Sequence, residues 1–346
     1  MLAYSLVLFI VIFWSWVEKK ALNRKAFWIP LITLALFAGI RSSNVGTDSG
    51  NYVKNFNDNI LLDYFEFREE VEYGYQILEY SILHLSNNYF WLFFITALLI
   101  VSSYLYIFRK LSVDYLASIY IYITFNFYTF FFNGLRQGIA MAIVALSIPY
   151  LIQKKFLFFL IFIILSSFFH KSALIMVLFY FLINLKIKIE YKLLTTFMGS
   201  LILSKIGIEY LGTINERYSS YSEVSDNSGG YLTLALYTLI GIFIYIFIKK
   251  SKGCDLNIKV LSQMYLLGVI FLIPIAMIGS NPSGPQRLLY YFVWTVALIF
   301  PYILKKINEK LIYIGFFAFC LIYFYLFTSS YANLSPYTMN ELFRIF

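Results

Sequence analysis

Long apolar runs separated by short polar breaks constrain the fold of this 346-residue chain more than any other feature. A helix that crosses a membrane needs about 20 mainly apolar residues, and shorter runs can cross where the bilayer thins or flanking side chains snorkel. Hydrophobic residues make up 61% of the chain and charged residues only 13%, which excludes a soluble domain of this length. The sequence therefore predicts an all-α polytopic membrane protein.

Twelve such runs indicate about 12 transmembrane helices. The run at 192–204 is short and contains Thr195, Thr196 and Ser200, so a pair of re-entrant half-spans within 192–230 is the alternative there. The expected spans lie near 2–17, 26–40, 89–107, 115–132, 134–151, 156–169, 172–185, 192–204, 230–248, 258–279, 287–304 and 310–328.

The distribution of charge predicts the orientation of these spans. Alternate loops contain 18 of the 27 basic residues but only 5 of the 18 acidic ones, which identifies those loops as cytoplasmic. The net charge of +9 is therefore explained by membrane orientation, and nucleic acid is not an expected partner. The first run lacks a basic segment before it and is followed by Lys19 and Lys20, so it is interpreted as a retained anchor. Both termini are expected outside.

The whole chain, 1–346, is expected to form a single integral membrane domain with two sizeable outer loops. The first, 41–88, has turn signals near its start, and its second half has apolar residues at helical spacing. We expect one or two amphipathic helices there, lying on the membrane surface. The second outer loop, 205–230, is polar.

Several chemistries are not supported by the sequence. Cys254 lies in a predicted cytoplasmic loop and Cys320 lies inside an apolar run, so the two cysteines are not expected to pair. We find no metal-ligand spacing, no glycine-rich phosphate loop and no paired acids at DxD spacing. No metal or cofactor is therefore expected, and the energy for a reaction would come from a pre-activated membrane substrate.

Cations at the outer ends of apolar runs are the main candidates for function. Arg41, Arg136 and Arg287 each lie at such a junction, on the side where the positive-inside rule predicts few cations. His170 and Lys171 form a fourth junction of this kind. A snorkelling anchor at the membrane boundary is the simpler interpretation of each residue. A cluster of them would instead bind an anionic group such as a lipid-linked diphosphate.

The residues around these cations favour a binding site. Asn133 and Gln137 flank Arg136, while Gln286 precedes Arg287, and Tyr290 and Tyr291 follow it. These amide and phenol groups could contact phosphate or sugar. The spans that begin at Arg136, Lys171 and Arg287 all enter from outside, so their helix N-termini would add unpaired N–H groups to an anion site if the helices are neighbours.

A proton acceptor has two candidates. Histidine is the side chain type that can exchange protons near neutral pH, so His170 could take a proton from an alcohol, although a lone histidine is often a satisfied polar group. Asp48 could act as the base or could only begin a turn. Glu72 and Tyr75, in the segment Glu72-Tyr73-Gly74-Tyr75, are candidate sugar contacts, and an acidic face of an amphipathic helix is the alternative for Glu72.

The chain resembles the EpsG/Wzy-type polymerases of bacterial exopolysaccharide and O-antigen repeat units. The similar segments are Arg41 with Val45-Gly46-Thr47-Asp48 and Tyr52, Glu72-Tyr73-Gly74-Tyr75, Asn133-Gly134-Leu135-Arg136-Gln137, His170-Lys171-Ser172-Ala173-Leu174, the arginine before tyrosine at Arg287, and Ser335-Pro336-Tyr337. Because the basic residues lie at span junctions and not in one large basic loop, the EpsG-like branch fits better.

The resemblance implies a glycosyltransferase that joins undecaprenyl-diphosphate-linked oligosaccharides at the outer face of the bacterial cytoplasmic membrane, without metal or nucleotide. Arg136 and Arg287 would hold the leaving diphosphate, Arg41 would assist, and His170 would be the first choice as base. A flippase and a chain-length regulator would be possible partners, besides the lipid bilayer itself.

Three other activities fit parts of the pattern. A flippase of lipid-linked oligosaccharide would also need a cationic cavity, but it should show inverted repeats and charges near the midplane. A glycosyltransferase that uses a polyprenyl-monophosphate sugar would favour Asp48 as the base. An acyltransferase would place its histidine near the cytoplasm, whereas His170 is predicted outside.

Overall fold

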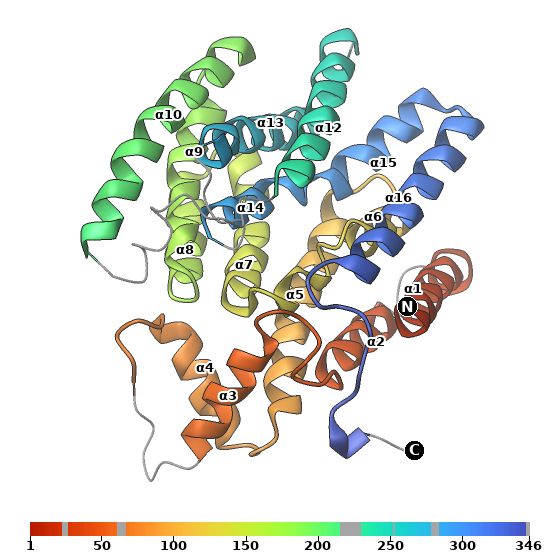
Figure 1. Ribbon diagram of the computed structural model, residues 1–346. Coiled ribbons are helices and arrows are strands. Elements are labelled where there is room, and N and C mark those ends of the chain that lie inside the picture. The colour runs from red at the N-terminus through yellow and green to blue at the C-terminus, as the bar shows by residue number, and fades with distance from the viewer. Residues whose placement is uncertain (23–26, 61–66, 215–229, 252, 278–283, 344–346) are drawn as a thin grey trace. The chain divides into compact units, whose positions relative to one another are not determined.

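The computed structural model describes residues 1–22, 27–60, 67–214, 230–251, 253–277 and 284–343 (Figure 1). Helices form nearly all the regular structure of these residues, and the described ranges contain no strand beyond an isolated bridge between Arg41 and Met339. The prediction of an all-α polytopic membrane protein is therefore confirmed.

The chain divides into two compact units. The first unit contains Met1–Tyr150, Lys155–Leu174 and Phe300–Phe346, and the second contains Leu151–Lys154 and Ile175–Ile299.

The first unit holds most of the helices. They are α1 (Leu2–Val17), η1 (Glu18–Leu22), α2 (Trp28–Gly39), α3 (Ser49–Ile60), α4 (Tyr73–Leu83), α5 (Tyr89–Leu111), α6 (Tyr115–Thr124), η2 (Thr129–Phe132), all but the end of α7 (Leu135–Ile152), α8 (Phe156–Ser167), η3 (Lys171–Leu174), most of α15 (Val296–Ile307), α16 (Lys310–Ser330) and η5 (Glu341–Phe343).

The second unit is built around α13, a long helix most of whose residues are buried. Its helices are α9 (Ile175–Asn184), α10 (Ile189–Ile214), α12 (Tyr231–Lys250), α13 (Leu256–Met277), η4 (Pro285–Leu289), α14 (Tyr290–Val293) and the first turn of α15.

The helices agree with the predicted spans in position. Within the described residues, eight helices are long and apolar enough to cross a membrane, and three shorter apolar helices coincide with the predicted spans 26–40, 156–169 and 172–185. The predicted span 192–204 lies inside α10, which is helical without a break from Ile189 to Ile214. The remainder of the second outer loop, 215–229, lies outside the described residues. The number of crossings stays a prediction.

Local sequence explains where the long helices begin and end. The side chain of Asn88 caps α5 by accepting a hydrogen bond from the N–H of Phe90, and Arg109 and Lys110 lie in its last turn, where they favour the helix dipole. Asp114 caps α6 in the same way, by accepting hydrogen bonds from the N–H groups of Leu116 and Ala117. At this end of the unit, Arg109 pairs with the buried Glu18.

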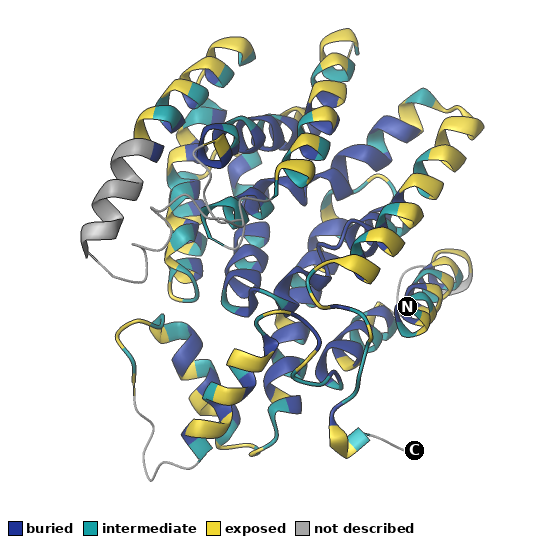
Figure 2. Ribbon diagram, in the orientation of Figure 1, coloured by how far each residue is buried: buried dark blue, intermediate teal, exposed yellow. Residues whose placement is uncertain are grey.

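Burial separates core helices from helices that face lipid. Figure 2 shows α5 and α7 as largely buried, whereas α16 presents mostly exposed residues. The exposed residues of α16 are apolar, as Leu311, Ile322 and Leu326 illustrate. In a multi-pass membrane protein such a surface contacts the hydrocarbon of the bilayer.

The predicted outer loop 41–88 contains two helices. Helix α4 lies in the stretch where amphipathic spacing predicted one, whereas α3 begins at the second turn signal and was not predicted. Helix α3 forms because Val53 and Phe56 recur at helical spacing and are both buried. The two helices pack against each other and against α5.

Candidate functional site

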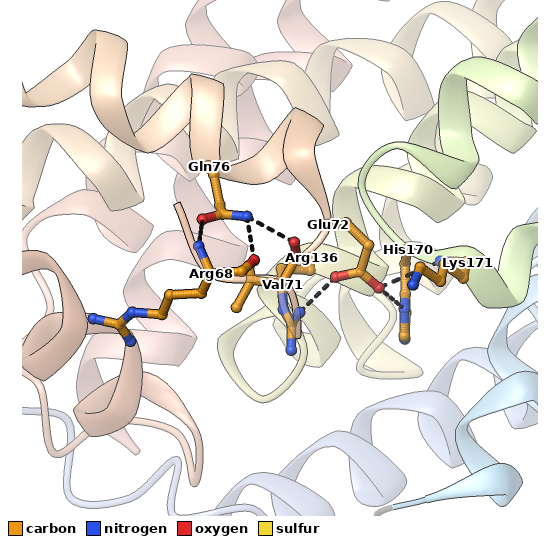
Figure 3. Close-up of polar contacts among 7 residues, drawn as sticks. All are labelled: Arg68, Val71, Glu72, Gln76, Arg136, His170 and Lys171. Atoms are coloured by element: carbon orange, nitrogen blue, oxygen red, sulfur yellow. Dashed lines mark hydrogen bonds and ion pairs between the residues drawn. The ribbon is translucent and has the colours of Figure 1, made fainter. Parts of the chain in front are cut away.

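A single carboxylate joins the cation of one predicted motif to the histidine of another (Figure 3). One oxygen of Glu72 accepts a hydrogen bond from Nη1 of Arg136 at 2.5 Å, and the other lies 2.9 Å from Nδ1 of His170. The backbone N–H of Lys171 lies 3.4 Å from that second oxygen. Residues 64 and 98 positions apart in the chain therefore meet at one point.

Glu72 is presented by a turn that Gln76 holds in place. The side-chain amide of Gln76 donates to the carbonyls of Arg68, at 2.9 Å, and Val71, at 2.7 Å, while its oxygen accepts from the N–H of Arg68 (Figure 3). Glu72 is the N-terminal cap residue of α4, but its side chain makes no capping bond. The carboxylate therefore makes no hydrogen bond to the N-terminus of α4 and instead contacts Arg136 and His170.

A glycine brings α4 close to the end of α8. The N–H of Gly74 donates to the carbonyl of Phe168 at 2.9 Å. A Cβ at position 74 would lie 2.7 Å from that oxygen, so only glycine allows this approach. Ser166 in turn anchors α8 to α7 by donating to the carbonyl of Ala140 at 2.8 Å. These contacts place His170, just beyond α8, beside the start of α4.

Arg136 is held at the start of α7 by contacts from the first motif. The side-chain oxygen of Asn133 accepts hydrogen bonds from the N–H and the hydroxyl of Thr47, at 2.5 and 2.9 Å. Gly46 has a φ of +99° and packs against the carbonyl of Phe132. The segment 45–48 and the segment 133–137, which both carry the family resemblance, are therefore adjacent. Asn133 acts here as a connector of the two segments.

The charges around Glu72 favour its ionised form. Burial alone would raise the pKa of Glu72, but the hydrogen bond from His170 and the positive charge of Arg136 outweigh burial and lower the pKa to about 2. An ionised Glu72 can only accept hydrogen bonds, so Nδ1 of His170 carries the proton in this contact. The side chains of Arg136 and His170 remain 19% and 33% exposed, which leaves both accessible from outside the protein.

Arg41 has a different environment from the one expected for a ligand-binding residue. Its side chain is fully buried, and its guanidinium stacks 3.6 Å from the ring centroid of Phe93 and 4.1 Å from that of Phe132. Nη1 donates to the carbonyl of Ala38. The adjoining backbone pairs with the C-terminal tail, since Ser42 donates to the carbonyl of Thr338 and Asn340 donates to that of Ile40. In this arrangement Arg41 stabilises the base of the outer loop.

Asp48 is half-buried and lies directly before α3, where its carbonyl accepts from the N–H groups of Asn51 and Tyr52. Gln137 is buried in the first turn of α7. Tyr75 is buried as well, and its ring lies 5.9 Å from that of Tyr52.

The cationic candidate Arg287 belongs to the second unit. Arg287 lies in η4 and is half-buried. Gln286 and Tyr290 line a small pocket of about 90 Å³ together with Gly230, Thr233 and Leu272, whereas Tyr291 is fully buried. Arg287 and Arg136 belong to different units.

A buried polar layer beneath Glu72 was not predicted. Glu79, on the inner face of α4, is only 4% exposed and accepts a long hydrogen bond of 3.5 Å from Asn59. Burial raises the pKa of Glu79 to about 7, against the opposing charge of Arg68. The hydroxyl of Tyr75 is buried and has no hydrogen-bond partner among the described residues. Helical spacing from Glu72 could have indicated the inward position of Glu79, whereas the role of Gln76 had no sequence signal.

The site contains the groups for binding an anion and accepting a proton. Arg136 has five N–H donors, and its contacts with Glu72 and Tyr52 do not use all of them. Lys171 is exposed and adds a positive charge next to His170, and its backbone N–H lies 3.4 Å from the carboxylate of Glu72. Within the described ranges, no group of three or more His, Cys, Asp or Glu side chains is arranged to hold a metal ion.

Comparison with known proteins identifies related sequences. Residues 24–339 match the EpsG family. The chain is also similar to the amylovoran biosynthesis protein AmsC of Erwinia amylovora, with 27% identity over 362 aligned positions that cover 95% of this chain and 92% of the relative. No solved structure matches the chain.

Proposed function

The chain belongs to the EpsG family, and from this premise we propose that it is an exopolysaccharide polymerase that joins undecaprenyl-diphosphate-linked oligosaccharides. The relative named for amylovoran biosynthesis supports a role in polysaccharide synthesis. The observation that carries the proposal is the carboxylate of Glu72, which joins Arg136, a candidate ligand of phosphate, to His170, a candidate base.

The reaction is a glycosyl transfer. A hydroxyl oxygen of the acceptor sugar attacks the anomeric carbon of the donor, and the bond from that carbon to the diphosphate oxygen breaks with its electron pair going to the diphosphate. With Nδ1–H of His170 donating to Glu72, Nε2 is the ring nitrogen that accepts the proton of the attacking hydroxyl. Glu72 fixes the tautomer and stabilises the imidazolium that forms.

Arg136 stabilises the leaving diphosphate. A guanidinium can make two parallel hydrogen bonds to phosphate oxygens, and the negative charge that develops on the leaving oxygen strengthens them. In the absence of substrate, Glu72 neutralises Arg136. A diphosphate carries more negative charge than a carboxylate and so competes for the guanidinium. Lys171, which is exposed and follows His170 in the chain, adds to the attraction.

The proposed site lies on the outer face of the bacterial cytoplasmic membrane, as the distribution of basic residues predicts. Lipid-linked units would arrive there from a flippase, and a chain-length regulator would set the size of the product.

The test is a complementation experiment in cells that lack the native gene. Variants Arg136→Ala, His170→Ala and Glu72→Gln are compared with His84→Ala, which changes the second histidine of the chain, an exposed residue at the end of α4. Expression is matched by immunoblot, and both polymer and lipid-linked oligosaccharide are quantified. We expect the first three variants to lose polymer at least about 100-fold, as removal of a general base does, and His84→Ala to retain it.

The lipid-linked pool distinguishes the alternatives. Single repeat units that accumulate on the outer face support a polymerase. Units that remain on the cytoplasmic face would identify a flippase instead. Wild-type polymer in both Arg136→Ala and His170→Ala would refute the proposed site.

A further inference from the structure

Helix α4 exposes apolar side chains on its outward face. Its buried face carries Tyr75, Gln76, Glu79 and Ile82, and its outward face carries Tyr73, Ile77 and Tyr80, which are 56%, 55% and 41% exposed. Leu85, just beyond the helix, is 73% exposed. The outward face of a helix in contact with water would mostly carry polar side chains, whereas here Gln76 and Glu79 lie on the buried face. Tyr73 contacts the ring of Phe67 and Tyr80 that of His84, but much of the surface of Tyr73, Ile77 and Tyr80 remains exposed.

The neighbouring helix α3 provides an internal comparison. It buries Val53 and Phe56 and exposes Asn51, Lys54 and Asn57, as expected for a helix in contact with water. The two helices lie in the same loop and pack against each other. Their outward faces therefore differ in chemistry although their positions in the chain are close.

Both ends of the α4 stripe lie near apolar helices that carry exposed side chains. At its start, Gly74 touches Phe168 at the end of α8, and Phe168 and Leu165 are about half exposed. At its end, Leu85 lies four residues before Tyr89, where the membrane helix α5 begins, and Trp91 in the first turn of α5 is 40% exposed. Each end of the stripe therefore adjoins an apolar helix, α8 by contact and α5 along the chain.

We propose that the face formed by Tyr73, Ile77, Tyr80 and Leu85 docks into the outer interface of the lipid bilayer. Tyrosine is enriched at this depth, where its ring lies among acyl chains and its hydroxyl meets the head groups. Ile77 and Leu85 add aliphatic area that has no polar group to offer a sugar, which favours lipid over a glycan chain as the occupant. The acidic residues of the loop oppose binding to anionic lipid, so the docking is driven by apolar burial.

Docking of α4 has a consequence for the candidate site. Glu72 is the cap residue of α4, and Gly74 fixes the start of the helix against Phe168. A bilayer that holds α4 therefore also holds the carboxylate that contacts Arg136 and His170. The docking itself depends only on the membrane position of the protein and not on the proposed polymerase activity.

The test measures the depth of α4 in the full-length protein. In a background with Cys254→Ser and Cys320→Ala, single cysteines are introduced by Ile77→Cys on α4 and by Asn57→Cys on α3 as the matched control. Each is labelled with a polarity-sensitive fluorophore and reconstituted into phosphatidylcholine nanodiscs. Quenching is measured with iodide in the water and with lipid that carries a nitroxide near the head group.

We expect the label at position 77 to be quenched by the nitroxide lipid at least twofold more than the label at position 57, and the order to be reversed for iodide. Equal quenching of both labels by iodide would overturn the proposal. Protection of position 77 only after addition of soluble oligosaccharide would identify a glycan platform and would also overturn it. Polymerase activity is not measured, so failure of this test is distinct from failure of the proposed function.

Discussion

At the scale of single residues, the geometry of Arg136 matters as much as its charge. Lysine carries the same charge but cannot form two parallel hydrogen bonds to phosphate. We expect Arg136→Lys to lower polymer formation by about tenfold or more, because hydrogen bonds to charged groups contribute about 1.5–3 kcal/mol. The measurement is polymer yield at matched expression, with Lys171→Arg as the control that conserves the neighbouring charge. Full activity of Arg136→Lys would contradict paired contacts to a diphosphate.

The pKa of Glu79 leads to a prediction about stability and pH. Because the folded protein raises this pKa to about 7 from the ordinary value of 4.5, the folded state binds the proton more tightly than the unfolded state. The contribution of Glu79 is therefore fully favourable below pH 4.5 and is lost as pH rises through 7, by up to about 3 kcal/mol.

Glu79→Gln removes this titration while conserving the shape of the side chain. We expect the melting temperature of the wild type to fall more between pH 5 and pH 8 than that of Glu79→Gln, as measured by thermal unfolding of the purified protein. Parallel curves for the two proteins would show that Glu79 does not titrate in this range.

The individual site residues could be proposed from the sequence, but their partnership could not. Arg136 and His170 are candidate functional residues because each lies between an apolar run and a polar break. Glu72 was considered as a sugar contact, yet the structure places it between those two residues. Since neither helical nor strand periodicity relates positions 72, 136 and 170, only the packing of α4 on α8 and α7 could bring them together. The burial of Arg41 could not be predicted from the sequence either, because it depends on contacts with the rings of Phe93 and Phe132, which are distant in the chain.

At the scale of elements, the contact between α4 and α8 determines whether Glu72 reaches His170. Gly74→Ala would place a methyl group 2.7 Å from the carbonyl oxygen of Phe168, so the start of α4 must move away. We expect a loss of polymer of about tenfold or more, together with near-normal expression.

Gly50→Ala is the control, because a Cβ at position 50 would meet only the carbonyl of Ser43 at an ordinary 3.6 Å. A loss of activity in Gly50→Ala equal to that in Gly74→Ala would indicate general sensitivity of the loop and not the specific contact.

The membrane helices could be predicted more completely than the loop helices. Apolar runs specify a span directly, and all twelve predicted runs coincide with helices. Helix α3 was harder to predict because Gly50, Asn51, Asn55 and Asn57 have low helix propensity and resemble a turn. Tertiary burial of Val53 and Phe56 overrides that preference. The exposure of Tyr73, Ile77 and Tyr80 on α4 could not be recognised from spacing alone, since spacing identifies a stripe but not the side that is buried.

At the scale of the whole molecule, orientation in the membrane decides whether the candidate site can meet a substrate on the outer face. Asn87 lies between α4 and α5 and is predicted outside, whereas Asp255 lies between α12 and α13 and is predicted inside. Both residues are exposed, so a cysteine at either position is accessible to a water-soluble reagent. In the background without Cys254 and Cys320, we expect Asn87→Cys to react with an impermeant maleimide in intact cells, or in spheroplasts where an outer membrane is present.

Asp255→Cys should react only after the cells are permeabilised. Positions 87 and 255 lie on opposite sides only if the chain crosses the membrane an odd number of times between them. The pair of cysteines therefore also tests whether α10 crosses the membrane. The predicted spans from α5 to α12 number seven, which places positions 87 and 255 on opposite sides, whereas six crossings would place them on the same side. Labelling of both positions in intact cells would therefore remove one span from the predicted twelve. Labelling of Asp255→Cys alone would reverse the orientation and place Glu72, Arg136 and His170 at the cytoplasmic face, where an outer-face polymerase could not use them.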